Sequence, residues 1–156
     1  MFEAFRNFVA DLASGDRHPS GFGPDDYRLA AAALLVHAAV IDGKFSEAEQ
    51  RTLRALLQER FALDDHQVDD LIQQATAAEQ ESVDLYQFTR LLNDKLDEAG
   101  RARVIEMMWQ VAYADGHVSD YQDNLIWRAA DLLGVSSRER IALRQRIAEV
   151  RKGSTG

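Results

Sequence analysis

Carboxylates recur at two Asp-Gly turns, and they are the residues of this chain whose types and spacing could do chemistry. Each turn has an Asp, a Gly, an apolar residue, a Ser, and then an acid or amide three residues after the Ser. The matching positions are Asp42, Gly43, Phe45, Ser46 and Glu49 in the first turn, and Asp115, Gly116, Val118, Ser119 and Gln122 in the second. Such a duplication predicts an architecture built from two related halves.

Carboxylate oxygens are the ligands that calcium and magnesium take in proteins. An Asp at the end of a helix also faces the negative end of the helix dipole, which costs about 0.3–1 kcal/mol unless it is compensated. We therefore consider a cation held by Asp42 beside Glu49, and another held by Asp115 beside Asp120 or Asp123. Calcium or magnesium fits these oxygen ligands best. A nitrogen from His117 would instead admit zinc or manganese.

The first turn resembles the second half of an EF-hand calcium loop, but the first half of that loop is missing. The two earlier ligand positions are Ala38 and Val40, which offer no side-chain oxygen. The same positions of the second turn are Val111 and Tyr113, so neither turn is a working EF-hand.

A purely structural interpretation explains most of the repeated positions. The two glycines can take the left-handed conformation that ends a helix, and the two serines can cap the next helix. Phe45 and Val118 are predicted to pack the turns onto the core. Asp42 would then accept hydrogen bonds from the N–H groups of its own turn or pair with an Arg. The structural and the cation-linked interpretation of the Asp residues both stay open.

Apolar residues recur at helical spacing and alternating β-branched runs are absent, which predicts an all-α fold. Capping boxes, in which a Ser accepts from a backbone N–H and an acid or amide reaches back, are predicted to open three of the helices. We expect a single globular domain of seven to eight helices, near residues 2–12, 25–41, 46–61, 64–78, 82–92, 100–112, 119–134 and 136–151.

A Gly- and Pro-containing stretch separates the first amphipathic helix from the rest of the chain. We expect residues 1–24 to form this helix and a linker, and residues 25–152 to form the helical domain. Two pseudo-symmetric repeats would cover about residues 29–78 and 102–151, each centred on an Asp-Gly turn. The first helix would pack on the bundle or form a homodimer contact, because membrane-surface helices are usually more basic.

The composition excludes several classes of protein. The chain has no cysteine, so it forms no disulfide and no thiolate metal site, and it has no thiol for redox chemistry of its own. Its net charge of −8 disfavours nucleic acid as a partner. We find no apolar run long enough for a transmembrane segment and no signal peptide, which favours a cytoplasmic protein.

The charge is unevenly spread, because the C-terminal segment is basic. Its basic residues are Arg138, Arg140, Arg144, Arg146, Arg151 and Lys152. This segment would either pack across the acidic body or dock an acidic partner or a lipid surface.

We recognise no motif of an enzyme in this chain. His37 lies in an Ala-rich apolar helix, where a hydrogen-bonded histidine is the expected interpretation rather than a catalyst.

The segment from Leu29 to Gly43, followed by Phe45 to Glu49, resembles the TerB-like family, which is named for a tellurite-resistance protein. The second Asp-Gly turn matches the same signature, and the resemblance spans about residues 25–150. It implies an all-α, cytoplasmic, non-enzymatic module of two helical repeats. It further implies a role in tellurite and stress resistance, divalent cations at an acidic surface, and protein partners at the inner membrane.

Carried over residue by residue, the resemblance places acidic positions at Asp42 and Glu49 in the first turn and at Asp115 in the second, with Glu47 and Asp120 beside them. Gln122 departs from Glu49, which weakens a second cation site.

Three hypotheses follow. The first is a scaffold or sensor linked to a divalent cation. The second is a structural interaction domain with no metal site, and the third is a metal-dependent helical hydrolase, for which the sequence supplies too few ligands.

Overall fold

The computed structural model describes residues 22–23, 26–82 and 84–155. Within them the chain is all-helical, as predicted. The helices are α2 (Tyr27–Val40), α3 (Glu47–Arg60), α4 (Asp65–Glu81), α5 (Tyr86–Lys95), α6 (Glu98–Ala112), α7 (Asp120–Leu132) and α8 (Ser137–Thr155). The predicted first helix, near residues 2–12, and most of its linker lie outside the described residues.

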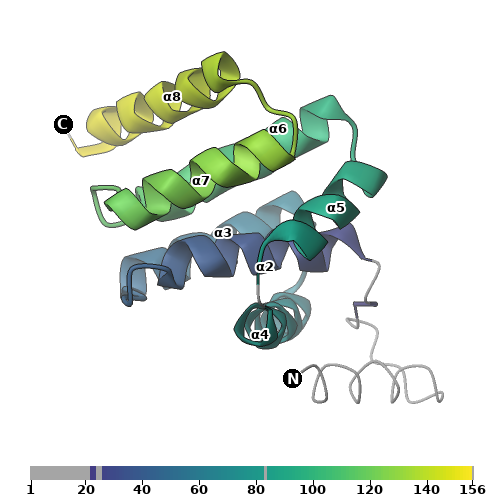
Figure 1. Ribbon diagram of the computed structural model, residues 1–156. Coiled ribbons are helices and arrows are strands. Elements are labelled where there is room, and N and C mark those ends of the chain that lie inside the picture. Colours follow the sequence, from purple (N-terminus) through teal and green to yellow (C-terminus); the bar gives the residue numbers. More distant parts are fainter. Residues whose placement is uncertain (1–21, 24–25, 83, 156) are drawn as a thin grey trace, which may run out of the picture.

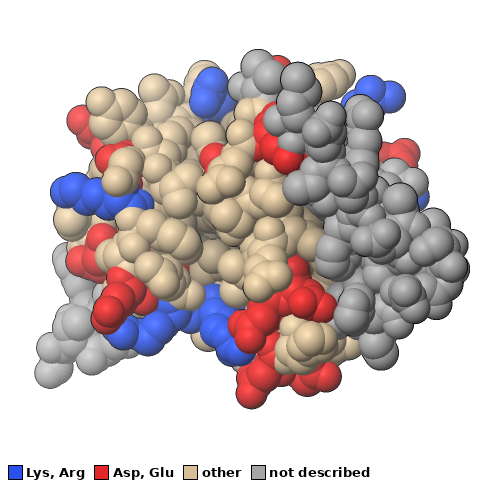
Figure 2. Space-filling model, turned by 90° about the horizontal axis from the view of Figure 1, so that it is seen from below, with Lys and Arg blue, Asp and Glu red and all other residues tan. Residues whose placement is uncertain are grey.

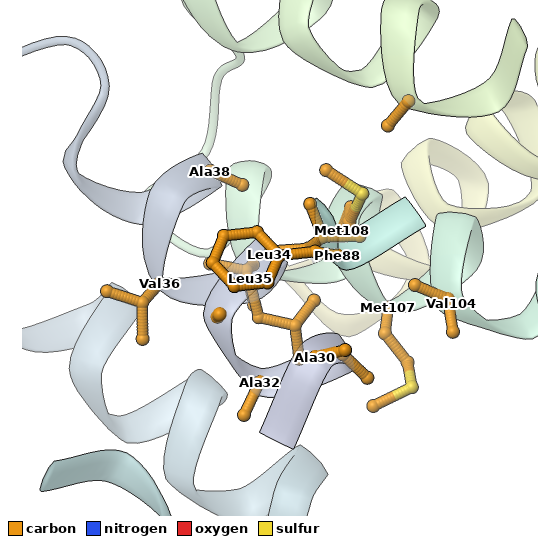
Figure 3. Close-up of a cluster of buried hydrophobic side chains, with 14 of the residues drawn as sticks. Ala30, Ala32, Leu34, Leu35, Val36, Ala38, Phe88, Val104, Met107 and Met108 are labelled. Carbon is orange, nitrogen blue, oxygen red and sulfur yellow. The ribbon is translucent and has the colours of Figure 1, made fainter. Parts of the chain in front are cut away.

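Helix α2 forms the centre of the bundle, because it is apolar on every face. Ten of its fourteen residues are buried, and most of them are Ala or Leu. It contacts α3, α4, α5, α6 and α7. Its small side chains let neighbouring helices approach closely, and Figure 3 shows Ala30, Leu34 and Ala38 in the same cluster as Phe88 of α5 and Met108 of α6.

The other helices lie on different sides of α2. Figure 1 shows α6, α7 and α8 stacked together above α2 and α3, while α4 crosses on the opposite side and α5 closes one end. This arrangement brings the α2–α3 turn and the α6–α7 turn to the same end of the bundle.

Charged side chains of both signs share the face that carries α4. In Figure 2, Lys and Arg side chains lie next to Asp and Glu side chains along its edge, and the centre is uncharged. Ion pairs also join α3 to α4, where Arg54 lies 3.6 Å from Asp65 and 3.1 Å from Asp69. These exposed pairs each contribute little to stability, but they link the two helices.

The predicted helix ends are right at most turns and wrong between α4 and α5. We expected a helix to end at residue 78 and Ser82 to open the next one. Instead α4 continues to Glu81, and Ser82 ends it. The Ser82 hydroxyl donates to the carbonyl oxygen of Asp84 at 2.6 Å, and the Asp84 carboxylate takes the first N–H of α5, from Tyr86, at 2.9 Å.

Candidate functional site

Both Asp-Gly turns have the backbone conformation that the sequence predicts. Gly43 has a φ of 81° and Gly116 a φ of 100°, which is the left-handed region that side chains disfavour. The Asp42 carboxylate accepts a hydrogen bond from the backbone N–H of Lys44 at 3.1 Å, within its own turn. This bond offsets the unfavourable position of Asp42 at the end of α2.

Capping boxes follow both turns. In the first, the Ser46 hydroxyl accepts from the N–H of Glu49 at 3.1 Å, and the Glu49 carboxylate accepts from the N–H of Ser46 at 3.0 Å. In the second, Ser119 and Gln122 make the same two bonds, each at 3.1 Å. The prediction from the Ser-x-x-Glu and Ser-x-x-Gln spacing is therefore confirmed in both turns.

The two capping boxes also bind each other. The side-chain amide of Gln122 donates to the second oxygen of Glu49 at 3.0 Å, and these residues stand 73 positions apart, at equivalent places of the sequence repeat. The same amide nitrogen donates to the carbonyl oxygen of Ala38 at 2.9 Å. Glu49 is 1% exposed and Gln122 is 2% exposed, so this contact joins the turns inside the protein.

Burial raises the pKa of Glu49 above its ordinary value, because a carboxylate loses its hydration there. The negative charge of Asp115 raises it further, while the hydrogen bonds from Ser46 and Gln122 act in the opposite direction. The charge of one turn thus acts on the carboxyl of the other.

The remaining predicted ligands lie nearer the surface. Asp42 is half-buried, and Glu47, Asp115 and Asp120 are exposed. In the part of the chain that the structure describes, no three His, Asp or Glu side chains are grouped closely enough to hold one metal ion. The cation site therefore stays a prediction.

Two exposed aromatic side chains stand at the joined turns. Phe45 is 36% exposed and Tyr121 is 65% exposed. The prediction that Phe45 packs its turn onto the core is wrong, because this side chain is exposed and is not among those that pack against the core, whereas Val118 is. The position of Tyr121, next to Asp120 at the start of α7, was a signal in the sequence that we did not use.

His37 is hydrogen-bonded, as predicted. Its Nδ1 lies 2.8 Å from a carboxylate oxygen of Glu79 on α4, and both side chains are partly exposed. The pair lies in a cavity at the meeting point of α2, α4, α5 and α7, far along α2 from its N-terminus.

The basic C-terminal segment packs across the acidic body through at least two of its arginines. Arg144 donates to Asp123 at 2.7 Å and to the Tyr113 hydroxyl at 3.0 Å. Arg146 donates to Glu106 at 2.8 Å. These contacts tie α8 to α6 and α7.

No described helix is both long enough and apolar enough to cross a membrane. The comparison with curated proteins and the comparison with solved structures gave no match. The sequence model of the family described as tellurite resistance protein TerB matches residues 28–145, from the start of α2 into α8. The match includes both Asp-Gly turns and the Glu49–Gln122 contact, and covers most of the chain. This chain therefore belongs to the TerB family.

Proposed function

We propose that this TerB-family chain is a non-enzymatic protein-binding module of a tellurite-type stress response, and that it acts in the cytoplasm. The binding surface would be the joined turns, which we call the acidic end: Asp42, Phe45, Glu47, Asp115, Asp120 and Tyr121. The partner would be a protein at the inner membrane, as the resemblance implies.

The observation that supports this proposal is the combination of exposed rings and carboxylates at the acidic end. Tyr121 exposes most of its side chain and Phe45 about a third, and both are close in sequence to exposed Glu47 or Asp120. Aromatic side chains supply much of the energy at protein interfaces, and charged neighbours set the orientation of the partner. The internal Glu49–Gln122 bond holds the two turns in one arrangement. The surface would therefore lose little conformational entropy when a partner binds.

Site-specific photo-crosslinking in the native host tests this proposal. A photoreactive residue at position 121 should crosslink to one defined protein, and the same residue at position 127 should not. Trp127 is a matched control, because it is an aromatic residue of the same helix and is 47% exposed. Equal crosslinking from both positions, or none from position 121, would contradict the proposal.

A growth assay tests the physiological part. The double variant Phe45→Ser/Tyr121→Ser should fail to restore tellurite resistance to a strain that lacks the gene, while Trp127→Ser should restore it. Thermal unfolding of both purified variants checks that each is folded. Full resistance with the double variant would show that the aromatic residues of the acidic end are not needed for tellurite resistance.

A second candidate is a divalent cation bound at the same end. It is favoured by the effect of Asp115 on Glu49, because a cation between the turns would relieve this repulsion. The proposed ligands are Asp42, Glu49, Asp115, Glu47 and Asp120. Both oxygens of Glu49 already accept hydrogen bonds, so the outer carboxylates would carry most of the coordination.

An amide-resolved NMR titration of metal-stripped protein with calcium, magnesium, manganese and zinc tests this candidate. Saturable shifts confined to residues 42–49 and 115–123, lost in Asp42→Asn/Asp115→Asn, would support it and identify the ion. Weak shifts spread over every acidic surface would leave the protein-binding module without a cation.

A further inference from the structure

A cavity of about 330 Å³ is lined by none of the residues of the acidic end. Charged or polar, aromatic and aliphatic side chains line it, and they come from four helices and the α4–α5 connection. They are His37 of α2, Glu79 of α4, Ser82 and Asp84 of the connection, Leu85, Tyr86 and Phe88 at the start of α5, and Arg128 and Leu132 of α7. This volume suits a small molecule or one long side chain.

Among the described residues, two carboxylates in the cavity each use only one of their two oxygens in a hydrogen bond. Glu79 uses one oxygen for His37, at 2.8 Å, and Asp84 uses one for the N–H of Tyr86, at 2.9 Å. Neither second oxygen accepts a hydrogen bond from a described residue. Because α4 ends at Ser82, the negative end of its helix dipole also lies at this cavity.

Apart from His37, Ser82 and Arg128, the remaining walls are apolar and aromatic. Leu85 and Phe88 are nearly buried, at 6% and 8% exposed, and form the inner part. Tyr86 and Leu132 are 59% and 40% exposed, so their side chains are available at the mouth. Aliphatic stems pack well on such a surface, and aromatic faces attract cations.

We infer that this cavity binds an organic cation carried on an aliphatic stem. The positive group would lie between Glu79 and Asp84, and the stem would cover Leu85 and Leu132. A lysine side chain of another protein and a free alkylamine share this chemistry. The site is distinct from the acidic end, and the inference holds whether or not that end binds a partner.

Arg128 makes the inference easy to test. It makes no ion pair or hydrogen bond with a described residue, and its charge opposes a cation in the cavity. Replacing Arg128 by an uncharged side chain should therefore tighten binding of a cation. If the cavity instead bound an anion, the same replacement would weaken binding. The two classes of ligand thus predict opposite signs for one variant.

The test is an amide-resolved NMR titration of the full chain with four probes. Two are cations, Nα-acetyl-lysine amide and n-butylamine, and two are controls, the isosteric neutral Nα-acetyl-norleucine amide and the anion hexanoate. We expect saturable shifts at residues 79, 82, 84–88, 128 and 132 with the cations only. Tighter binding of the lysine derivative would point to a partner's side chain, and equal binding of butylamine to a free amine.

Conservative variants then assign the charge. Glu79→Gln and Asp84→Asn each keep the oxygen that is used internally but lose the negative charge, and each should weaken cation binding about tenfold, the scale of one charge-assisted contact. Arg128→Met should tighten it. Asp94→Asn is the control, because that carboxylate is 73% exposed on α5 and does not line the cavity.

Binding of hexanoate, weaker binding in Arg128→Met, or no saturable shift with either cation would overturn the inference. Asp84 is exposed, so Asp84→Asn remains informative even if Glu79→Gln disturbs the fold through His37.

Discussion

Glu49 and Gln122 occupy equivalent positions of the sequence repeat, yet they cannot replace one another singly. Each uses one side-chain oxygen to accept the N–H of its own capping serine. What remains is one acceptor, on Glu49, and one donor group, on Gln122, at a separation of 3.0 Å. A buried contact of this kind is costly to leave half-made.

We predict that Glu49→Gln destabilises the protein by about 1–3 kcal/mol at neutral pH, because two amide donors would then face each other in the interior. Adding Gln122→Glu should recover part of this loss, since the swap restores one donor and one acceptor between the pair but removes the amide donor to the carbonyl oxygen of Ala38. Urea unfolding of both single variants and the double variant gives the coupling energy. Additive losses would show that the contact contributes nothing to stability.

The raised pKa of Glu49 predicts a dependence of stability on pH. A carboxyl whose pKa is higher in the folded state contributes stability below its unfolded pKa, about 4.3, and this contribution is lost as pH rises through the folded value. The unfolding free energy of the wild type, minus that of Glu49→Gln, should therefore fall as pH rises from about 4 towards neutral. Urea midpoints at successive pH values measure it, and a constant or rising difference would contradict the prediction.

At this scale the sequence predicted the capping boxes of the two Asp-Gly turns but not the bond between them. The Ser-x-x-Glu spacing is a local signal, because both partners lie within one helical turn. The contact between Glu49 and Gln122 depends on how α3 and α7 are brought together, which no local pattern contains. Phe45 was predicted wrongly for a related reason: an apolar residue in a turn packs inward only if a neighbouring helix covers it.

The ends of α3 and α7 form a natural comparison at the scale of the helix. Both are followed by a residue with positive φ: Ala62 at 51° after α3, and Gly134 at 72° after α7. In each case the next N–H returns to the helix, from Leu63 to Gln58 and from Val135 to Ala130. The same motif therefore ends both helices. Gly134 fits its left-handed conformation after α7, whereas Ala62 is strained in it after α3.

We predict that Ala62→Gly stabilises the protein by about 0.5–1 kcal/mol, because relief of the left-handed strain exceeds the added entropy of the unfolded chain. Gly134→Ala should destabilise it by a similar amount, since an added Cβ would meet no atom within 4 Å and only the backbone is strained. Thermal unfolding measures both. If both variants lose stability, the backbone at Ala62 is not strained as described.

The helices themselves were largely predictable, and the connection between α4 and α5 was not. Helix α2 was found from its run of small apolar residues, and α3 and α7 from their capping serines. The α4–α5 connection was not, because Ser82 resembles an N-cap in sequence. Asp84 binds the first N–H of α5 instead, and a choice between two capping side chains so close together depends on how the segment packs.

At the scale of the whole molecule, Arg144 helps to hold α8 to the bundle, together with Arg146 and the buried Leu143 and Ile147. The Arg144 guanidinium bonds Tyr113 and Asp123 and lies 5.1 Å from the ring centre of Trp109. We predict that Arg144→Met destabilises the protein by about 1 kcal/mol, because these groups are partly exposed and their charges are screened. Hydrogen exchange should become faster in α8 first.

Arg138→Met is the matched control, because Arg138 is an exposed arginine of the same helix with no partner among the described residues. Its stability should equal that of the wild type. If both variants lose the same stability, the basic charge of α8 matters and the individual contacts do not.

The all-α class and the family were predictable from the whole sequence, since helical periodicity and the Asp-Gly signature extend over most of it. The cavity was not. Its residues come from positions 37 to 132 and share no spacing, so only the packing of α2, α4, α5 and α7 reveals it.

The hydrogen bond between Glu49 and Gln122 also affects which fragments of this protein would associate with one another. If the chain were divided between α5 and α6, one fragment would hold Glu49 and the other Gln122. Two copies of the first fragment would bring two buried carboxylates together, and two copies of the second would oppose two amide donors. Only the mixed pair sets a donor against an acceptor. If like fragments met through this same contact, the asymmetric pair of side chains would favour complementation between unlike fragments over self-association of either.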